Sequence, residues 1–95
     1  VNSTTVTIDD PIFTLGGDST PGSDDNKDRG IEFKYHTGSA AKVGFMGMDD
    51  SDYKFKFIPD ASNSSEVFSG SVGSAEFNDV EAATITSATI DCGTF

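Results

Sequence analysis

The sequence has no tryptophan, one cysteine and few basic residues. Cys92 cannot form an intramolecular disulfide, which excludes the disulfide-stapled folds of small secreted proteins. Six Lys and Arg oppose 16 Asp and Glu, and the net charge of -10 would repel DNA, RNA and anionic membrane surfaces. No apolar run approaches the ~20 residues that span a bilayer. We therefore expect neither nucleic-acid partners nor membrane insertion.

Motifs for catalysis are also missing. His36 is the only histidine, and no nucleophile or metal-ligand partner is near it in sequence. The Gly-x-Ser-x-Gly elbow of serine hydrolases is absent, although distant residues could still assemble such a site. We expect no enzymatic activity, with His36 an outward-facing strand residue. Cys92 is expected to be a small, partly buried apolar residue, not a reactive thiol.

Alternation of apolar and polar residues is the main structural signal, because no stretch keeps helical spacing for more than a turn. This pattern predicts an all-β fold. Strands are expected over residues 2–8, 12–15, 31–36, 41–48, 53–58 and 66–69. Residues 16–30 are rich in Gly, Ser, Asp and Pro, and they predict a long surface loop.

An antiparallel hairpin is predicted where residues 41–48 and 53–58 flank an acidic turn at residues 49–52. Tyr53, Phe55 and Phe57 alternate with Lys54 and Lys56, so we expect one aromatic and one charged face. Val43 and Phe45 are expected to meet the aromatic face across the ladder, and the glycines at 44 and 47 leave room for a large neighbour or for bulges. In the strand before the hairpin, Ile31, Phe33 and Tyr35 are expected on the buried face.

The C-terminal part of the sequence repeats. Val80, Ile85, Ile90 and Phe95 are five residues apart and follow similar Ala/Thr or Gly/Thr pairs in three cases. Neither a flat strand nor an α-helix places such residues on one face, whereas a β-helix-like coil of short segments does. An ordinary edge strand of Thr and Ala explains the pattern equally well.

The predicted organisation is one domain with two parts. Residues 1–74 form an antiparallel hairpin or sandwich module, and residues 75–95 form the β-repeat segment. The sequence begins without Met and the repeat still runs at its end, so we expect an excised or processed piece whose repeat is continued by further chain or by partner strands. A chain of 95 residues also has little core of its own, which favours oligomerisation.

Two acidic clusters are candidates for Ca²⁺. Asp24, Asn26 and Asp28 alternate ahead of Gly30 and Ile31, as at the start of a calcium loop. The glycine is one place late, however, and Tyr35 stands where the loop needs Glu, which favours a solvated turn. Asp49, Asp50 and Asp52 form the second cluster, which a charged hairpin tip explains equally well. No other cofactor is expected.

Three stretches, residues 24–33, 41–45 and 57–70, together with the Ala/Thr/Ile repeats that follow, resemble virion structural proteins of marine tailed phages, including cyanophages. The likeness covers roughly residues 10–90. Met46 and Met48 stand where that pattern suggests aromatics. The resemblance implies a segment of a tail or capsid fibre, a homotrimer that contacts other virion proteins and has a role in assembly and host attachment. It assigns no functional residues.

We expect the oligomer and core to be built by Phe33, Phe45, Phe55 and Phe57 together with Val80, Ile85 and Ile90. The alternative function is a binding module on an extracellular or virion surface, for calcium or for host glycans.

Overall fold

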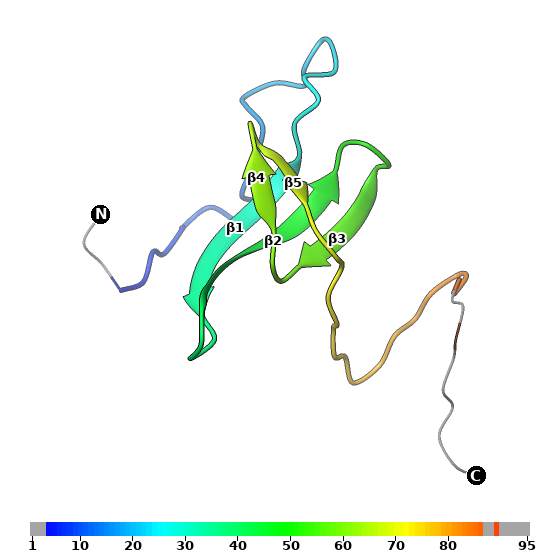
Figure 1. Cartoon of the computed structure of the whole chain (residues 1–95). Helices are drawn as coiled ribbons and strands as arrows, with labels where there is room; N and C mark the ends of the chain where they lie inside the picture. The colour runs from blue at the N-terminus through cyan, green and yellow to red at the C-terminus, as the bar shows by residue number, and fades with distance from the viewer. Residues whose placement is uncertain (1–3, 87–88, 90–95) are drawn as a thin grey trace.

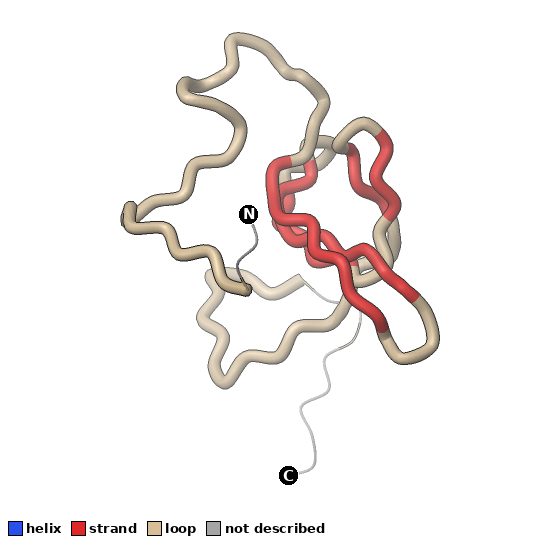
Figure 2. Tube along the Cα trace, turned by 90° about the vertical axis from the view of Figure 1, so that its left-hand side faces the viewer, coloured by secondary structure: helices blue, strands red, loops and turns tan. Residues whose placement is uncertain are grey.

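All five strands lie in the middle of the chain, in a computed structural model that describes residues 4–86 and 89 (Figure 1). They are β1 (Arg29–His36), β2 (Ala41–Asp49), β3 (Lys54–Ile58), β4 (Ser62–Ser64) and β5 (Val67–Ser69). The described residues contain no helix, so the predicted all-β class is confirmed. Figure 2 shows these strands gathered on one side, with the long loops on the other.

Strands β1, β2 and β3 form an antiparallel sheet in that order. The predicted hairpin is confirmed: Asp49 pairs with Lys54, and the Tyr53 N–H donates to the Asp49 carbonyl at 2.8 Å to close the turn. Tyr53 has φ 60° and lies in this turn, not in the strand. Strands β4 and β5 form a second, two-residue-turn hairpin whose turn residues Ser65 and Glu66 both have positive φ.

The sheet has two unlike faces. On the packed face, Phe45 pairs with Ile58, and the small hairpin of β4 and β5 lies against them through Phe68. Phe45 and Ile58 are 1% and 2% exposed, and they are the hydrophobic core of the described chain. Gly30 and Gly47 pair directly beneath the Phe45 ring, where a Cβ on either would collide with it. The core is therefore only a few side chains deep.

The register corrects one expectation about the hairpin. Phe45 was expected to share a face with Phe55 and Phe57, but Met46 pairs with Phe57 and Met48 with Phe55. Side chains alternate between faces, so Phe45 points to the opposite face from the aromatics. The four-residue turn sets this register, and a shift of one residue reverses every side chain.

Two predicted strands do not form. Residues 4–28 contain no strand, although 2–8 and 12–15 were expected to be strands; residues 2 and 3 lie outside the described part of the chain. The physical reason is pairing: a strand needs a hydrogen-bonded neighbour, and these residues pair with none of the five strands. Strand β4 was not predicted, because its three polar residues resemble loop sequence.

Residues 70–86 also form no strand, and they leave the sheet beside β3 (Figure 1). Val80 and Ile85 of the five-residue repeat are exposed there, and Ile90 lies outside the described residues.

Candidate functional site

The second face of the sheet is apolar and open, and we call it the apolar face. It consists of the apolar side chains on alternate positions of all three strands: Ile31, Phe33, Tyr35, Met46, Met48, Phe55 and Phe57. Arg29 and Lys42 lie on the same face at its two ends. Phe55 is 74% exposed, Ile31, Tyr35, Met46 and Met48 are also exposed, and Phe33 and Phe57 are half-buried. Contiguous apolar surface of this kind marks interaction sites in soluble proteins. The expectation that Ile31, Phe33 and Tyr35 are buried therefore fails for Ile31 and Tyr35.

The rings of the apolar face are held in place by backbone shape. The Phe33 ring lies over Gly44, its partner across the ladder, and any side chain there would displace it. It reaches Phe57 on the far strand, with ring centroids 6.0 Å apart and planes at 21°. The predicted role of Gly44 and Gly47, to leave room for large neighbours, is confirmed at both positions. At the other end of β1, the Tyr35 hydroxyl donates to the Pro59 carbonyl.

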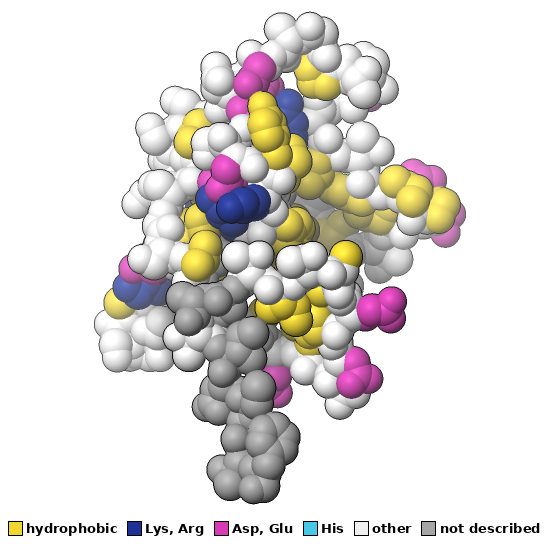
Figure 3. Space-filling model, turned by 90° about the vertical axis from the view of Figure 1, so that its right-hand side faces the viewer, with side chains coloured by type: hydrophobic (Ala, Val, Ile, Leu, Met, Phe, Trp, Pro, Cys, Tyr) yellow, Lys and Arg dark blue, Asp and Glu magenta, His cyan; other side chains and the backbone are white. Residues whose placement is uncertain are grey.

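A groove continues the apolar face past β3. The Gly73 N–H donates to the Phe57 carbonyl at 2.8 Å and holds the segment after β5 along the outer edge of β3. Between this segment and the sheet is a cavity of about 690 Å³, lined mainly by apolar side chains that include Phe55, Val72 and Phe77. Viewed from the β3 side, the hydrophobic side chains form open patches at the surface (Figure 3).

Asp28 is a structural anchor, not a solvent-facing ligand. One carboxylate oxygen accepts the Asp50 N–H at 2.9 Å, and the other accepts the Phe68 N–H at 2.7 Å. The residue is 9% exposed, and it links the start of β1 to the β2–β3 turn and to β5. Both oxygens are therefore occupied by backbone donors.

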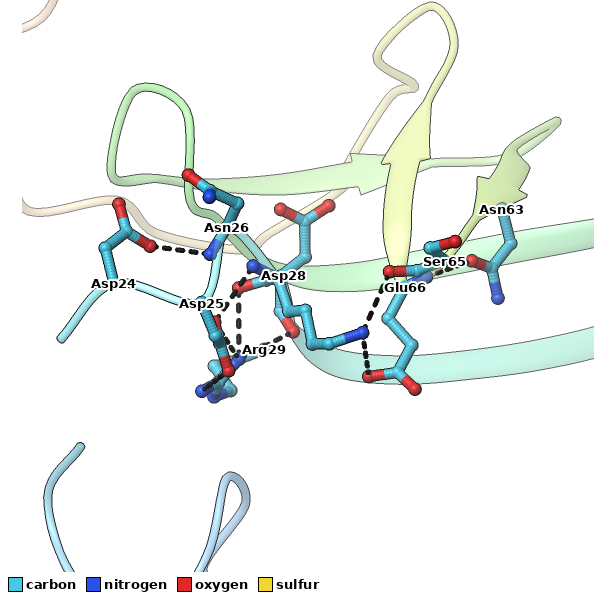
Figure 4. Close-up of polar contacts among 9 residues, drawn as sticks. Asp24, Asp25, Asn26, Asp28, Arg29, Asn63, Ser65 and Glu66 are labelled. Carbon is cyan, nitrogen blue, oxygen red and sulfur yellow. Dashed lines mark hydrogen bonds and ion pairs between the residues drawn. The ribbon is translucent and has the colours of Figure 1, made fainter. Parts of the chain in front are cut away.

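The other residues of the predicted calcium loop point elsewhere (Figure 4). The Asp24 carboxylate accepts the Asn26 N–H at 2.7 Å in a local turn. Asp25 forms an ion pair with Arg29 at 2.8 Å, and this hydrogen bond lowers the pKa of Asp25 and raises that of Arg29. Across residues 4–86, no group of three His, Cys, Asp or Glu is arranged to hold a metal ion. Asp24 and Asn26 are exposed and close a local turn, whereas Asp28 is buried and is not part of a solvated turn.

The acidic hairpin tip is tied down by lysine. Lys56 contacts Asp49 at 2.7 Å and Asp52 at 3.0 Å. The hydrogen bonds from Lys56 and Ser51 lower the pKa of Asp49 to about 2. The pKa of Asp50 shifts in the opposite direction. Partial desolvation raises it, and the adjacent Asp24 carboxyl raises it further.

The sequence pattern predicts the residues of the two sheet faces only in part. Phe33, Phe55 and Phe57 do lie on the apolar face, but Phe45 lies in the core. The methionines of the apolar face and the stacking partner Phe68 were missed. The alternation of Met46 and Met48 with Gly47 was the available signal, and it could be used only once the register was known. His36 is exposed at the end of β1, as predicted, and its Nδ1 accepts the Gly38 N–H at 2.9 Å.

Comparisons with known proteins add no identification: no family model, curated protein or solved structure matches the chain. The described part of the chain contains no helix long and apolar enough to cross a membrane.

Proposed function

We propose that this chain is a structural segment of a fibre that is assembled from copies of itself, and that the apolar face is buried between those copies. The open apolar face is the observation on which the proposal depends. Its exposed rings, led by Phe55, would not remain in water in a stable monomer of this size. The hydrophobic core of the described residues, Phe45 and Ile58, is small for an independent domain, and a neighbouring copy would add the missing burial.

The proposed setting is the virion of a tailed phage, as a homotrimeric tail or capsid fibre with a role in assembly and host attachment. The resemblance to phage virion proteins supports this setting. The number of three copies also comes from this resemblance, whereas closed cyclic symmetry of any order would cover each copy's apolar face without leaving open ends. In this assembly the repeats of residues 75–95 would coil around one another as a β-helix-like stalk, which would cover Val80 and Ile85.

The alternative function is a surface module for calcium or host glycans. The contacts of Asp28 oppose the calcium version, because both of its oxygens already accept backbone N–H groups. The glycan version would leave the chain monomeric, so the same experiment separates it from the fibre.

Sedimentation equilibrium of the 95-residue chain tests the proposal. The wild type is compared with the test variant Phe55→Asp and with the matched control Tyr53→Asp. Both residues are highly exposed aromatics, 74% and 68%, and both changes add one negative charge. Phe55 lies on the apolar face, whereas Tyr53 lies in the turn. We expect a mass of three chains for the wild type and for Tyr53→Asp, and a monomer for Phe55→Asp. A folded wild-type monomer would refute the proposal.

A further inference from the structure

We propose that the free edge of β1 accepts residues 4–8 of a neighbouring copy as an added strand. This inference rests on the proposed function, and it names the contact that joins one copy to the next. Strand addition to an open sheet edge is a common mode of association, because backbone hydrogen bonds supply affinity and alternating side chains supply register.

The outward groups of β1 follow from the ladder. The Val43 carbonyl accepts the Ala61 N–H at 2.8 Å on the β3 side of β2, so Gly44 and Met46 direct their backbone groups toward β1. Their partners Phe33 and Ile31 point back toward β2. The alternate residues Gly30, Glu32, Lys34 and His36 therefore direct their N–H and C=O groups outward. Within the described residues, no backbone group bonds to this row.

The opposite edge is less open. On β3 the Gly73 N–H already occupies the outward carbonyl of Phe57. Strand β1 is also longer, with eight residues against five. The β1 edge is therefore the larger unpaired site.

Residues 4–8 have the sequence of a strand without a partner. Thr5 and Thr7 alternate with Val6 and Ile8, and the alternation predicts a strand with one polar and one apolar side. In the structure this segment forms no strand, and Val6 and Ile8 are 70% and 48% exposed. Figure 1 shows it leading away from β1.

The two alternations match. Beside β1, Val6 and Ile8 would extend the apolar face next to Ile31 and Phe33. The threonines would then lie on the packed face, next to its exposed polar residues Glu32 and Lys34. A shift of one residue would place Val6 and Ile8 beside the charged residues Glu32 and Lys34, so the side-chain alternation favours one register of the added strand.

Charge favours the same pairing. Strands β1 and β3 contain four of the six basic residues of a chain with net charge -10: Arg29, Lys34, Lys54 and Lys56. Neither Lys34 nor Lys54 forms an ion pair with the described residues, so both edges attract an acidic segment and the unpaired backbone groups select β1. The incoming segment has no base and is followed directly by Asp9 and Asp10. A lysine on a sheet edge disfavours pairing with another basic edge, and it attracts a neutral segment that acidic residues follow.

Cysteine cross-linking of the full chain tests this contact. All variants also contain Cys92→Ser, because Cys92 is the only native cysteine. A tagged Thr7→Cys chain is mixed with an untagged Lys34→Cys chain, refolded together and treated with a short bismaleimide. The matched control is Lys54→Cys, since Lys54 lies on the same face at the opposite edge. We expect a heterodimer with Lys34→Cys and at least fivefold less with Lys54→Cys.

Each other result overturns the inference. A predominant Lys54→Cys product would place the segment on β3. An intramolecular cross-link in a chain that contains both Thr7→Cys and Lys34→Cys would show that the segment pairs with β1 of its own copy. Absence of cross-links in a chain that sediments as an oligomer would remove the strand addition and leave the proposed function intact. A monomeric wild type would remove both.

A backbone variant gives a second readout. Lys34→Pro deletes one outward N–H at an edge, where proline is tolerated, and Lys34→Thr removes the charge but keeps the N–H. We expect Lys34→Pro to raise the dissociation constant of the assembly roughly fivefold to tenfold above that of Lys34→Thr, the effect of one net hydrogen bond. Equal dissociation constants in two folded variants would contradict the pairing.

Discussion

Phe45 of β2 and Phe68 of β5 stack with ring centroids 4.3 Å apart and planes at 13°. They join the two sheets, because the small hairpin makes its apolar contact with the larger sheet through this pair. The Asp28 carboxylate accepts the Phe68 N–H and fixes the same residue from the side. The Asp28 N–H donates to the Glu66 carbonyl at 2.9 Å and Lys27 contacts Glu66 at 3.4 Å, so the ring pair and the carboxylate act together with contacts at the hairpin's turn.

We expect Phe45→Ala to cost about 3–5 kcal/mol of unfolding free energy, the usual range for a buried Phe. Since domains this small are only marginally stable, the variant should be largely unfolded. Urea denaturation followed by circular dichroism measures the loss. Phe13→Ala is the control, because Phe13 is exposed in a segment without strands, and its midpoint should not move. Equal midpoints for the two variants would show that the Phe45 stack is not the core.

Asp28→Asn should destabilise the fold by about 1–3 kcal/mol, since the amide has one acceptor oxygen for two backbone donors. Asp24→Asn keeps an oxygen for the Asn26 N–H and should change the midpoint little. Thermal denaturation of both variants and the wild type, with CaCl₂ and with EDTA, distinguishes a structural role of Asp28 from a role as a cation ligand. We expect no shift from either addition. A rise in melting temperature with Ca²⁺ that Asp28→Asn abolishes would instead support the calcium module.

Local patterns predicted the strands that find partners within the chain. Residues 31–36, 41–48 and 53–58 alternate strongly, and each lies within one or two residues of β1, β2 or β3. The hairpin was predictable because the acidic residues at 49–52 interrupt two apolar runs. The alternation at residues 4–8 is similar in kind, yet no strand forms there, because alternation states a preference and pairing requires a neighbour.

The contents of each face could not be predicted from composition. Whether Phe45 or Met46 faces Phe57 depends on one residue of register, which the turn geometry sets. The anchoring role of Asp28 depends on Phe68, which is 40 residues away in sequence, and no local pattern encodes that contact. The local pattern therefore offers Asp28 only as a weak calcium candidate or as part of a solvated turn, because it uses neighbouring residues alone.

The ion pair of Asp49 and Lys56 should make stability depend on pH in the acid range. The folded-state pKa of Asp49, about 2, lies below its usual 3.8, so the pair stabilises the fold above pH 3.8. That contribution is lost as the pH falls from 3.8 toward 2. Denaturation midpoints at pH 7, 4 and 2.5 should fall less steeply in Lys56→Met than in the wild type. Lys34→Met is the control, because Lys34 has no ion pair with the described residues. Parallel pH curves for the wild type and Lys56→Met would contradict the assignment.

The five-residue repeat predicts a difference between two adjacent positions. If the repeats of several copies coil together, Ile85 points inward and Thr84 does not, so Ile85→Asp buries a charge and Thr84→Asp adds one at the surface. We expect Ile85→Asp to give monomeric or aggregated material, while Thr84→Asp sediments as the wild type does. Ile85 is exposed in the single chain, so neither change should alter the denaturation midpoint of the monomer. An unchanged oligomer from Ile85→Asp would refute the intertwined repeat but not the apolar face, because Phe55→Asp probes that contact separately.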